Sequence, residues 1–175
     1  LGSGPGSDLI ASFDPVLRAP SCGATVGRSC DTRTLVRGRA HLGPEPNQPN
    51  TIGDRCADGT AGEGSNDRIV VTSADGASFA PGLGVTIEAT VFARSDFSQD
   101  AADFFFAADA DDPTWEYIGT EVPTAPGVQT LSVVYRLPPG GRQAVRVQFR
   151  NQGAPDACSA GPFDDRDDLV FAVGN

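Results

Sequence analysis

Two acidic clusters are the residues of this chain whose type and spacing could do chemistry. One lies in a glycine-rich stretch, 54–67, and the other directly precedes an apolar segment near the C-terminal end. Hard divalent cations such as Ca²⁺ bind about six to eight oxygens, which carboxylates supply. The clusters therefore predict a structural Ca²⁺ site, with candidate ligands Asp54, Asp58, Glu63, Asp67, Asp164, Asp165 and Asp168. The alternative is a solvated acidic rim whose charge is offset by Arg55, Arg68 and Arg166.

Familiar catalytic groups are scarce in the sequence. His41 is the only histidine and there is no lysine, so Ser-His-Asp, Cys-His and Ser-Lys arrangements depend on at most one residue. Two carboxylates can hydrolyse a glycoside, but 23 acidic residues make some pair inevitable, and abundance gives no specificity. We therefore expect no catalytic residues and no enzyme, with a carboxylate-based hydrolase as the remaining enzymatic alternative.

The charge balance excludes several classes of partner. Thirteen arginines stand against 23 acidic residues, which gives a net charge of −10. Nucleic acid and anionic membrane surfaces both attract basic patches, so neither is expected as a partner. No apolar run approaches the roughly 18 residues of a membrane span, and membrane insertion is not expected.

The four cysteines predict an oxidising compartment. They lack the spacing of a zinc site and allow three disulfide pairings. Cys22 and Cys30 flank a short stretch that could close on itself, which would leave Cys56 to pair with Cys158. That second bond would bring both acidic clusters to one end of the fold. A secreted or cell-surface protein follows, the alternative being four buried thiols in a cytosolic one.

Short strands are the elements that must position these residues. Segments 85–94 and 144–150 alternate apolar and polar residues, which is typical of half-buried strands. Segment 131–137 is a third strand, joined to 144–150 by a hairpin or a short crossover. Residues 104–106 form an apolar run compatible with a strand covered on both faces. The other candidate strands are 9–17, 34–39, 68–72, 103–108, 115–120 and 168–173.

This pattern predicts an all-β protein, an antiparallel β-sandwich (jelly roll) of about nine strands with little helix. Residues 1–7 are expected to be a flexible leader, native or left over from cloning, and 8–175 one domain. Trp115 and Tyr117 alternate on one predicted strand and could stack on sugar rings. For the single tryptophan, the favoured interpretation is that it anchors the core between the two sheets.

Four stretches carry a resemblance to a known class of modules: 43–51, 65–69, 113–120 and 164–168. Together with the acidic doublet that enters the last strand, they resemble galactose-binding-like jelly rolls and carbohydrate-binding modules. The closest likeness is to non-catalytic modules attached to secreted bacterial hydrolases and surface proteins, and it runs from Asp8 onward. It implies a jelly roll, often with a structural cation, that attaches its owner to polymers or surfaces.

Two functions follow as expectations. The first is a secreted, calcium-stabilised module for adhesion or binding to extracellular polysaccharide or matrix. The second is a structural subunit of an extracellular filament, whose N-terminal strand, Asp8 to Arg18, would complete the sheet of a neighbouring copy. The partners would accordingly be polysaccharide, matrix or copies of the chain itself.

Overall fold

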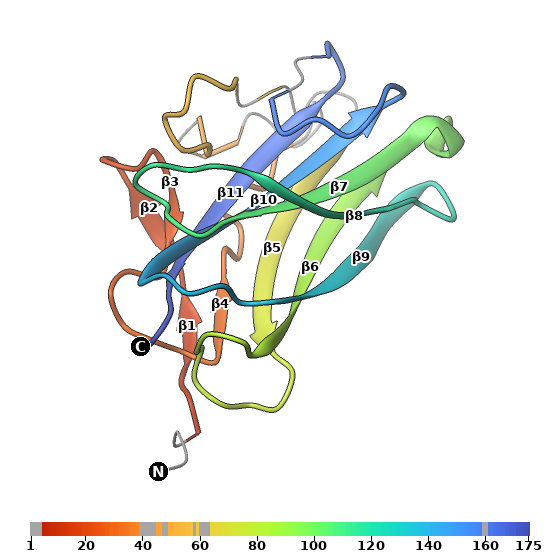
Figure 1. The fold of residues 1–175 in the computed structure, drawn as a ribbon. Coiled ribbons are helices and arrows are strands. Elements are labelled where there is room, and N and C mark those ends of the chain that lie inside the picture. The colour runs from red at the N-terminus through yellow and green to blue at the C-terminus, as the bar shows by residue number, and fades with distance from the viewer. Residues whose placement is uncertain (1–4, 39–44, 47–48, 58, 60–63, 159–160) are drawn as a thin grey trace.

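The computed structural model describes residues 5–38, 45–46, 49–57, 59, 64–158 and 161–175 (Figure 1). Strands make up nearly all of their regular structure, and the one short helical turn is η1 (Phe97–Gln99). The strands are β1 (Asp8–Ile10), β2 (Ser12–Asp14), β3 (Ala19–Ser21), β4 (Ser29–Asp31), β5 (Ser65–Ser73), β6 (Gly84–Ala93), β7 (Asp100–Ala107), β8 (Glu116–Glu121), β9 (Gly127–Arg136), β10 (Arg142–Asn151) and β11 (Asp165–Ala172).

The strands form two facing sheets (Figure 1). One has the order β1-β4-β5-β6-β9 and the other the order β2-β3-β11-β10-β7-β8. Most neighbours are antiparallel, whereas β1 runs parallel to β4 and β3 runs parallel to β11. The predicted all-β sandwich is therefore confirmed, with the difference that both sheets are mixed.

The core lies between the two sheets because apolar residues alternate along the strands. Its buried side chains come from β5, β6, β7, β10 and β11 and include Ile69, Val71, Val85, Ile87, Val91, Phe104, Val145, Val147, Phe149, Leu169 and Phe171. Removing this apolar surface from water is the main force that holds the sheets together.

The outer face of the six-stranded sheet is also covered. Arg146 and Gln148 point away from the core, as their alternation with valines predicts, yet both are fully buried. Segment 49–57 and a second apolar cluster lie over this face. That cluster consists of Leu17, Ala19, Ile52, Ala110, Ala144 and Val170, with Trp115 packed against it.

Two predicted strands differ from the structure. The segment predicted as 9–17 divides at buried Ala11 into β1 and β2, which belong to different sheets. The segment predicted as strand 34–39 begins in a turn, 33–36, in which the Leu35 backbone amide donates to the Thr32 carbonyl (3.1 Å). The connection from β9 to β10 is a crossover between the sheets, one of the two alternatives considered.

Two disulfides, Cys22–Cys30 and Cys56–Cys158, tie the chain together in the predicted pairing. Disulfides persist in oxidising compartments, so both are compatible with an extracellular protein. Among the described residues, no helix has the length and apolar character needed to cross a bilayer.

Candidate metal centre

Strand β11 divides the C-terminal acidic cluster between two faces of its sheet. Leu169 and Phe171 point into the core. Counting back in steps of two places Asp165 and Asp167 on the same inner face, at the end of the sandwich where β5 and β11 begin (Figure 1). Asp168 lies on the opposite, outer face.

A β-bulge at the start of β5 brings an asparagine to the same inner region. Asn66 is opposite Val91, and the register then shifts so that Asp67 is an extra residue before Arg68. Because Val91 is a core side chain, its cross-strand partner Asn66 also faces inward. Bulges re-aim side chains in this way.

Three carboxylates meet beside this asparagine. One oxygen each from Glu45, Asp165 and Asp167 lies within 4.8 Å of the others, and all three residues are buried. The backbone amide of Asn66 donates to Asp165 Oδ2 (2.8 Å), and its side-chain Nδ2 donates to Asp167 Oδ2 (3.1 Å). Asn50 Nδ2 donates to Glu45 Oε2 (2.8 Å). We call Glu45, Asn66, Asp165 and Asp167 the inner cluster.

The inner cluster has the donor chemistry of a hard cation site. Asn66 is fully buried, and its Oδ1 accepts no hydrogen bond from any described residue. A 180° rotation of this side-chain amide would place Oδ1 3.1 Å from Asp167 Oδ2. Two ligand oxygens of one Ca²⁺ lie at about that separation, since each Ca–O distance is about 2.3–2.6 Å.

The outer face of β11 carries a different arrangement. Arg146 grips Asp168 with two parallel bonds, Nε to Oδ1 (2.7 Å) and Nη2 to Oδ2 (2.8 Å), and Nη2 also lies 3.0 Å from Asp54 Oδ2. Trp115 Nε1 donates to the same Asp54 oxygen (2.6 Å), and the guanidinium lies 4.1 Å from the centre of the indole ring. Burial acts to lower the pKa of Arg146, but the two carboxylates outweigh it and raise the pKa.

A second buried arginine extends this arrangement. Arg166 is 1% exposed and donates to the carbonyl of Ala57, while Arg146 Nη1 donates to the carbonyl of Ala157 (2.7 Å). Burial, and then the charge of Arg146, lower the pKa of Arg166. Ala57 and Ala157 each adjoin a cysteine of the long-range disulfide, which thus fixes both carbonyls over the arginines. We call Asp54, Trp115, Arg146, Arg166 and Asp168 the outer network.

The structure distributes the predicted metal ligands over several places. Asp165 belongs to the inner cluster. Asp54 and Asp168 are brought together as expected, but Arg146 lies between them and balances their charge. Asp58 and Glu63 lie outside the described residues.

The remaining two predicted ligands have other contacts. Asp164 accepts hydrogen bonds from the backbone amides of Gly161 (3.0 Å) and Asn151 (3.2 Å). Asp67, the bulge residue, accepts one from Ser65 Oγ (2.7 Å). The prediction omitted three members of the inner cluster, Glu45, Asn66 and Asp167.

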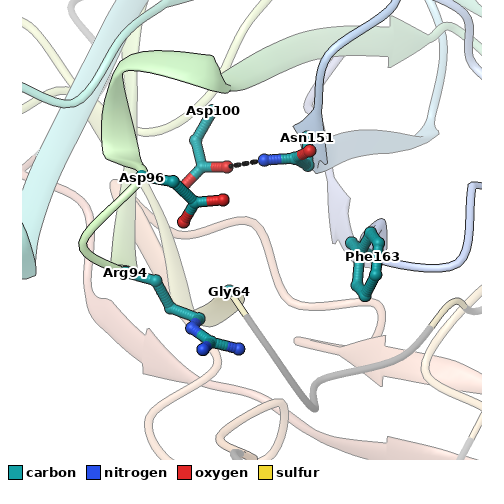
Figure 2. Close-up of a pocket in the computed structure, with 6 residues that line it drawn as sticks. All are labelled: Gly64, Arg94, Asp96, Asp100, Asn151 and Phe163. Atoms are coloured by element: carbon teal, nitrogen blue, oxygen red, sulfur yellow. Dashed lines mark hydrogen bonds between the residues drawn. The ribbon is translucent and has the colours of Figure 1, made fainter.

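A small pocket lies beside Gly64 and Phe163, which precede β5 and β11 (Figure 2). Its volume is about 70 Å³, and Asn151 Nδ2 donates to Asp100 Oδ1 (2.8 Å) within it. Burial raises the pKa of the Asp100 carboxyl, and the charge of nearby Asp96 acts in the same direction. Ligand pockets usually measure about 300–1,000 Å³, so this one suits water or a single hydroxyl group. It is lined by Gly64, Arg94, Asp96, Asp100, Asn151 and Phe163.

The two aromatic ligand candidates lie in unlike surroundings. Trp115 packs on the second apolar cluster, where Asp54 and Arg146 hold it. This cluster lies on the outer face of the six-stranded sheet, so the prediction that Trp115 anchors the core between the sheets is wrong in its location. Tyr117 is 53% exposed, bonds Thr120 through its hydroxyl (2.7 Å) and packs edge-on against Phe105.

The sequence matches no protein-family model, and no curated protein is significantly similar to it.

Proposed function

We propose that this chain is a non-catalytic extracellular module, stabilised by Ca²⁺, that attaches to polysaccharide or matrix. The observation that carries the proposal is the inner cluster, in which three buried carboxylates converge beside the buried side-chain amide of Asn66. A cation at this centre would join the starts of β5 and β11 to Glu45.

Electrostatics favours a cation at the inner cluster. Like charges this close raise one another's proton affinity, and burial adds to the cost of keeping them ionised. A divalent cation offsets both effects, and carboxylate with carboxamide oxygens is the ligand set that Ca²⁺ prefers. Carboxylates buried in this way suit cation binding better than hydrolysis of a bulky substrate.

Thermal unfolding tests the proposal. Calcium at a hundredfold excess over its Kd stabilises a protein by about 2.7 kcal/mol, which for a chain of this size raises Tm by about 5–10 °C relative to chelator. Asp165→Asn, which removes one charge from the inner cluster, should abolish most of that difference. Asp112→Asn, at an exposed turn, is the matched control and should keep it. Superimposable curves of the parent protein in Ca²⁺ and in chelator would refute the calcium centre.

The N-terminal segment supports an independent module over the filament alternative. Leu9 of β1 is opposite Cys30 of β4, and Phe13 of β2 is opposite Pro20 of β3, so this segment pairs within its own chain. Strand addition to a neighbour would first have to break these pairings. Negative-stain microscopy should therefore show single particles, and regular filaments would favour the alternative.

A further inference from the structure

An arginine-lined groove lies on the outer face of the five-stranded sheet. Its volume is about 380 Å³, within the range of about 300–1,000 Å³ usual for ligand sites. We call it the arginine groove; it is lined by Arg33, Thr34, Arg37, Asp67, Arg68, Thr90 and Val128.

The sheet register explains why these side chains meet. Arg68 of β5 is opposite Thr90 of β6, and both alternate with core residues, so both point outward. Val128 of β9 is 59% exposed at the edge of the same face. The turn that follows β4 adds Arg33 and Arg37 from the other side.

Asp31 holds two of the arginines in place. Arg68 Nε donates to Asp31 Oδ1 (2.9 Å) and Arg33 Nε lies 3.0 Å from Asp31 Oδ2. Burial acts to raise the pKa of Asp31, but the bonds from Arg68 and the Arg33 amide outweigh it and lower the pKa. Arg33 has φ of 52°, a backbone conformation rare outside glycine. The hydrogen bond that its backbone amide donates to Asp31 Oδ1 (2.8 Å) stabilises this conformation. Two guanidiniums are thus fixed by one carboxylate.

Arg37 supplies charge that the described fold does not use. Its side chain is exposed and makes no hydrogen bond or ion pair with any described residue. Three arginines therefore face two carboxylates, Asp31 and Asp67, in a chain whose net charge is −10. Glu88, two residues from Thr90 on β6, adds a negative charge that acts on Arg68 at the margin.

We infer that the arginine groove binds an anionic polysaccharide through its carboxylate or sulfate groups. This rests on the proposed attachment function and names its substrate class. The planar guanidinium fork matches both groups and forms charge-assisted pairs with them. None of the described lining residues is aromatic, so stacking on a neutral sugar is not the mode of recognition. The hydroxyls of Thr34 and Thr90 and the apolar Val128 offer contacts to the sugar ring.

Three polymers with one backbone test this inference by affinity electrophoresis in constant Ca²⁺: dextran, carboxymethyl-dextran and dextran sulfate. Retardation is expected with one or both anionic polymers, which separates carboxylate from sulfate recognition, and not with dextran. Arg37→Ala should weaken binding by about tenfold, the effect of one lost charge-assisted contact. Arg136→Ala removes the same charge from the far end of β9 and should change binding little. Glu88→Gln should strengthen it.

The outcomes separate this inference from the proposed function. Equal retardation of the Arg37→Ala and parent proteins, or equal weakening by Arg136→Ala, would overturn the groove as the binding site. Dextran binding as tightly as its charged derivatives would overturn anion recognition while leaving attachment to polysaccharide intact. A single-stranded oligonucleotide that bound more tightly than either anionic polymer would also contradict the inference, because it would assign the groove to phosphate.

Discussion

The buried aspartates on the two faces of β11 have different neighbours. On the outer face, Asp168 lies opposite Arg146 on β10, and the carboxylate is paired within the chain. On the inner face, Asp165 and Asp167 lie opposite Phe149 and Val147, whose side chains carry no charge. The same short acidic run therefore contributes to an internal ion pair on one face and to a centre with cation chemistry on the other.

This difference shows that acidic density alone does not identify a cation site. A buried ion pair replaces the lost water around both partners, and removing one partner leaves an uncompensated charge. The inner cluster gathers three carboxylates, whose oxygens are the ligands that a hard cation prefers. The two faces should consequently respond differently to mutation and to calcium.

The largest effect is expected from removing the long-range disulfide. Cys56 and Cys158 are 102 residues apart in sequence, and closing so long a loop contributes about 4–5 kcal/mol in the chain-entropy model. The double serine variant should lose about that much free energy of unfolding in denaturant. It also releases the carbonyls of Ala57 and Ala157 that lie over the outer network. The Cys22–Cys30 pair, with a separation of 8, is the control and should cost about 2.5 kcal/mol. Equal losses would show that the cover over the arginines is not held by the disulfide.

The next largest effect concerns the outer network itself. Arg146→Met removes the guanidinium that pairs directly with both Asp168 and Asp54, which should destabilise the protein by about 3–5 kcal/mol in urea unfolding. A second change, Asp168→Leu, should restore part of the loss, because an apolar pair can replace a buried ion pair. If the double variant is no more stable than Arg146→Met, the charge of Asp168 is not the cause of the loss.

Adjacent substitutions on the two faces make the comparison direct. Asp167→Asn should retain stability in chelator, where it relieves repulsion, and lose most of the roughly 2–3 kcal/mol gained from calcium. Asp168→Asn should lose stability equally with and without calcium, because its partner is Arg146. Isothermal titration with Ca²⁺ alongside unfolding separates the two effects. A calcium response that survives in Asp167→Asn and disappears in Asp168→Asn would reverse the assignment of the faces.

The sandwich was accessible from the sequence because strands depend on local patterns. The disulfide pairing was accessible because Cys22 and Cys30 lie close in sequence, which leaves Cys56 to pair with Cys158. Alternation in 85–94 and 144–150 identified real strands and their core side chains. The alternation predicts correctly that Arg146 of β10 points away from the core, but it does not predict that this polar side chain is buried. Its burial depends on segment 49–57, which is distant in sequence and folds over it.

The inner cluster was less accessible for three separate reasons. Asp167 follows from counting back from Leu169, but the last strand is apolar on both faces, so its pattern does not reveal which face is inner. The inward direction of Asn66 depends on a bulge, which no residue type announces. Glu45 lies in a stretch of the sequence that is rich in proline and asparagine and has no apolar periodicity.

The smallest effect is expected at an exposed pair with the same geometry as the buried one. Arg28 donates two hydrogen bonds of 2.9 Å to Asp8, as Arg146 does to Asp168, but the Arg28 and Asp8 side chains are 41% and 63% exposed. The bonds from Arg28 and Ser29 lower the pKa of Asp8 to about 2. The pair therefore stabilises the fold above the ordinary aspartate pKa, and this is lost as the pH falls through about 2.

Asp8→Asn should accordingly change unfolding little at neutral pH, since solvent screens the pair. In a carboxyl NMR titration, Arg28→Gln should return the midpoint of Asp8 towards its ordinary value, whereas Arg136→Gln should leave it near 2. A large loss of stability from Asp8→Asn would show that geometry, and not burial, sets the strength of these arginine–aspartate pairs.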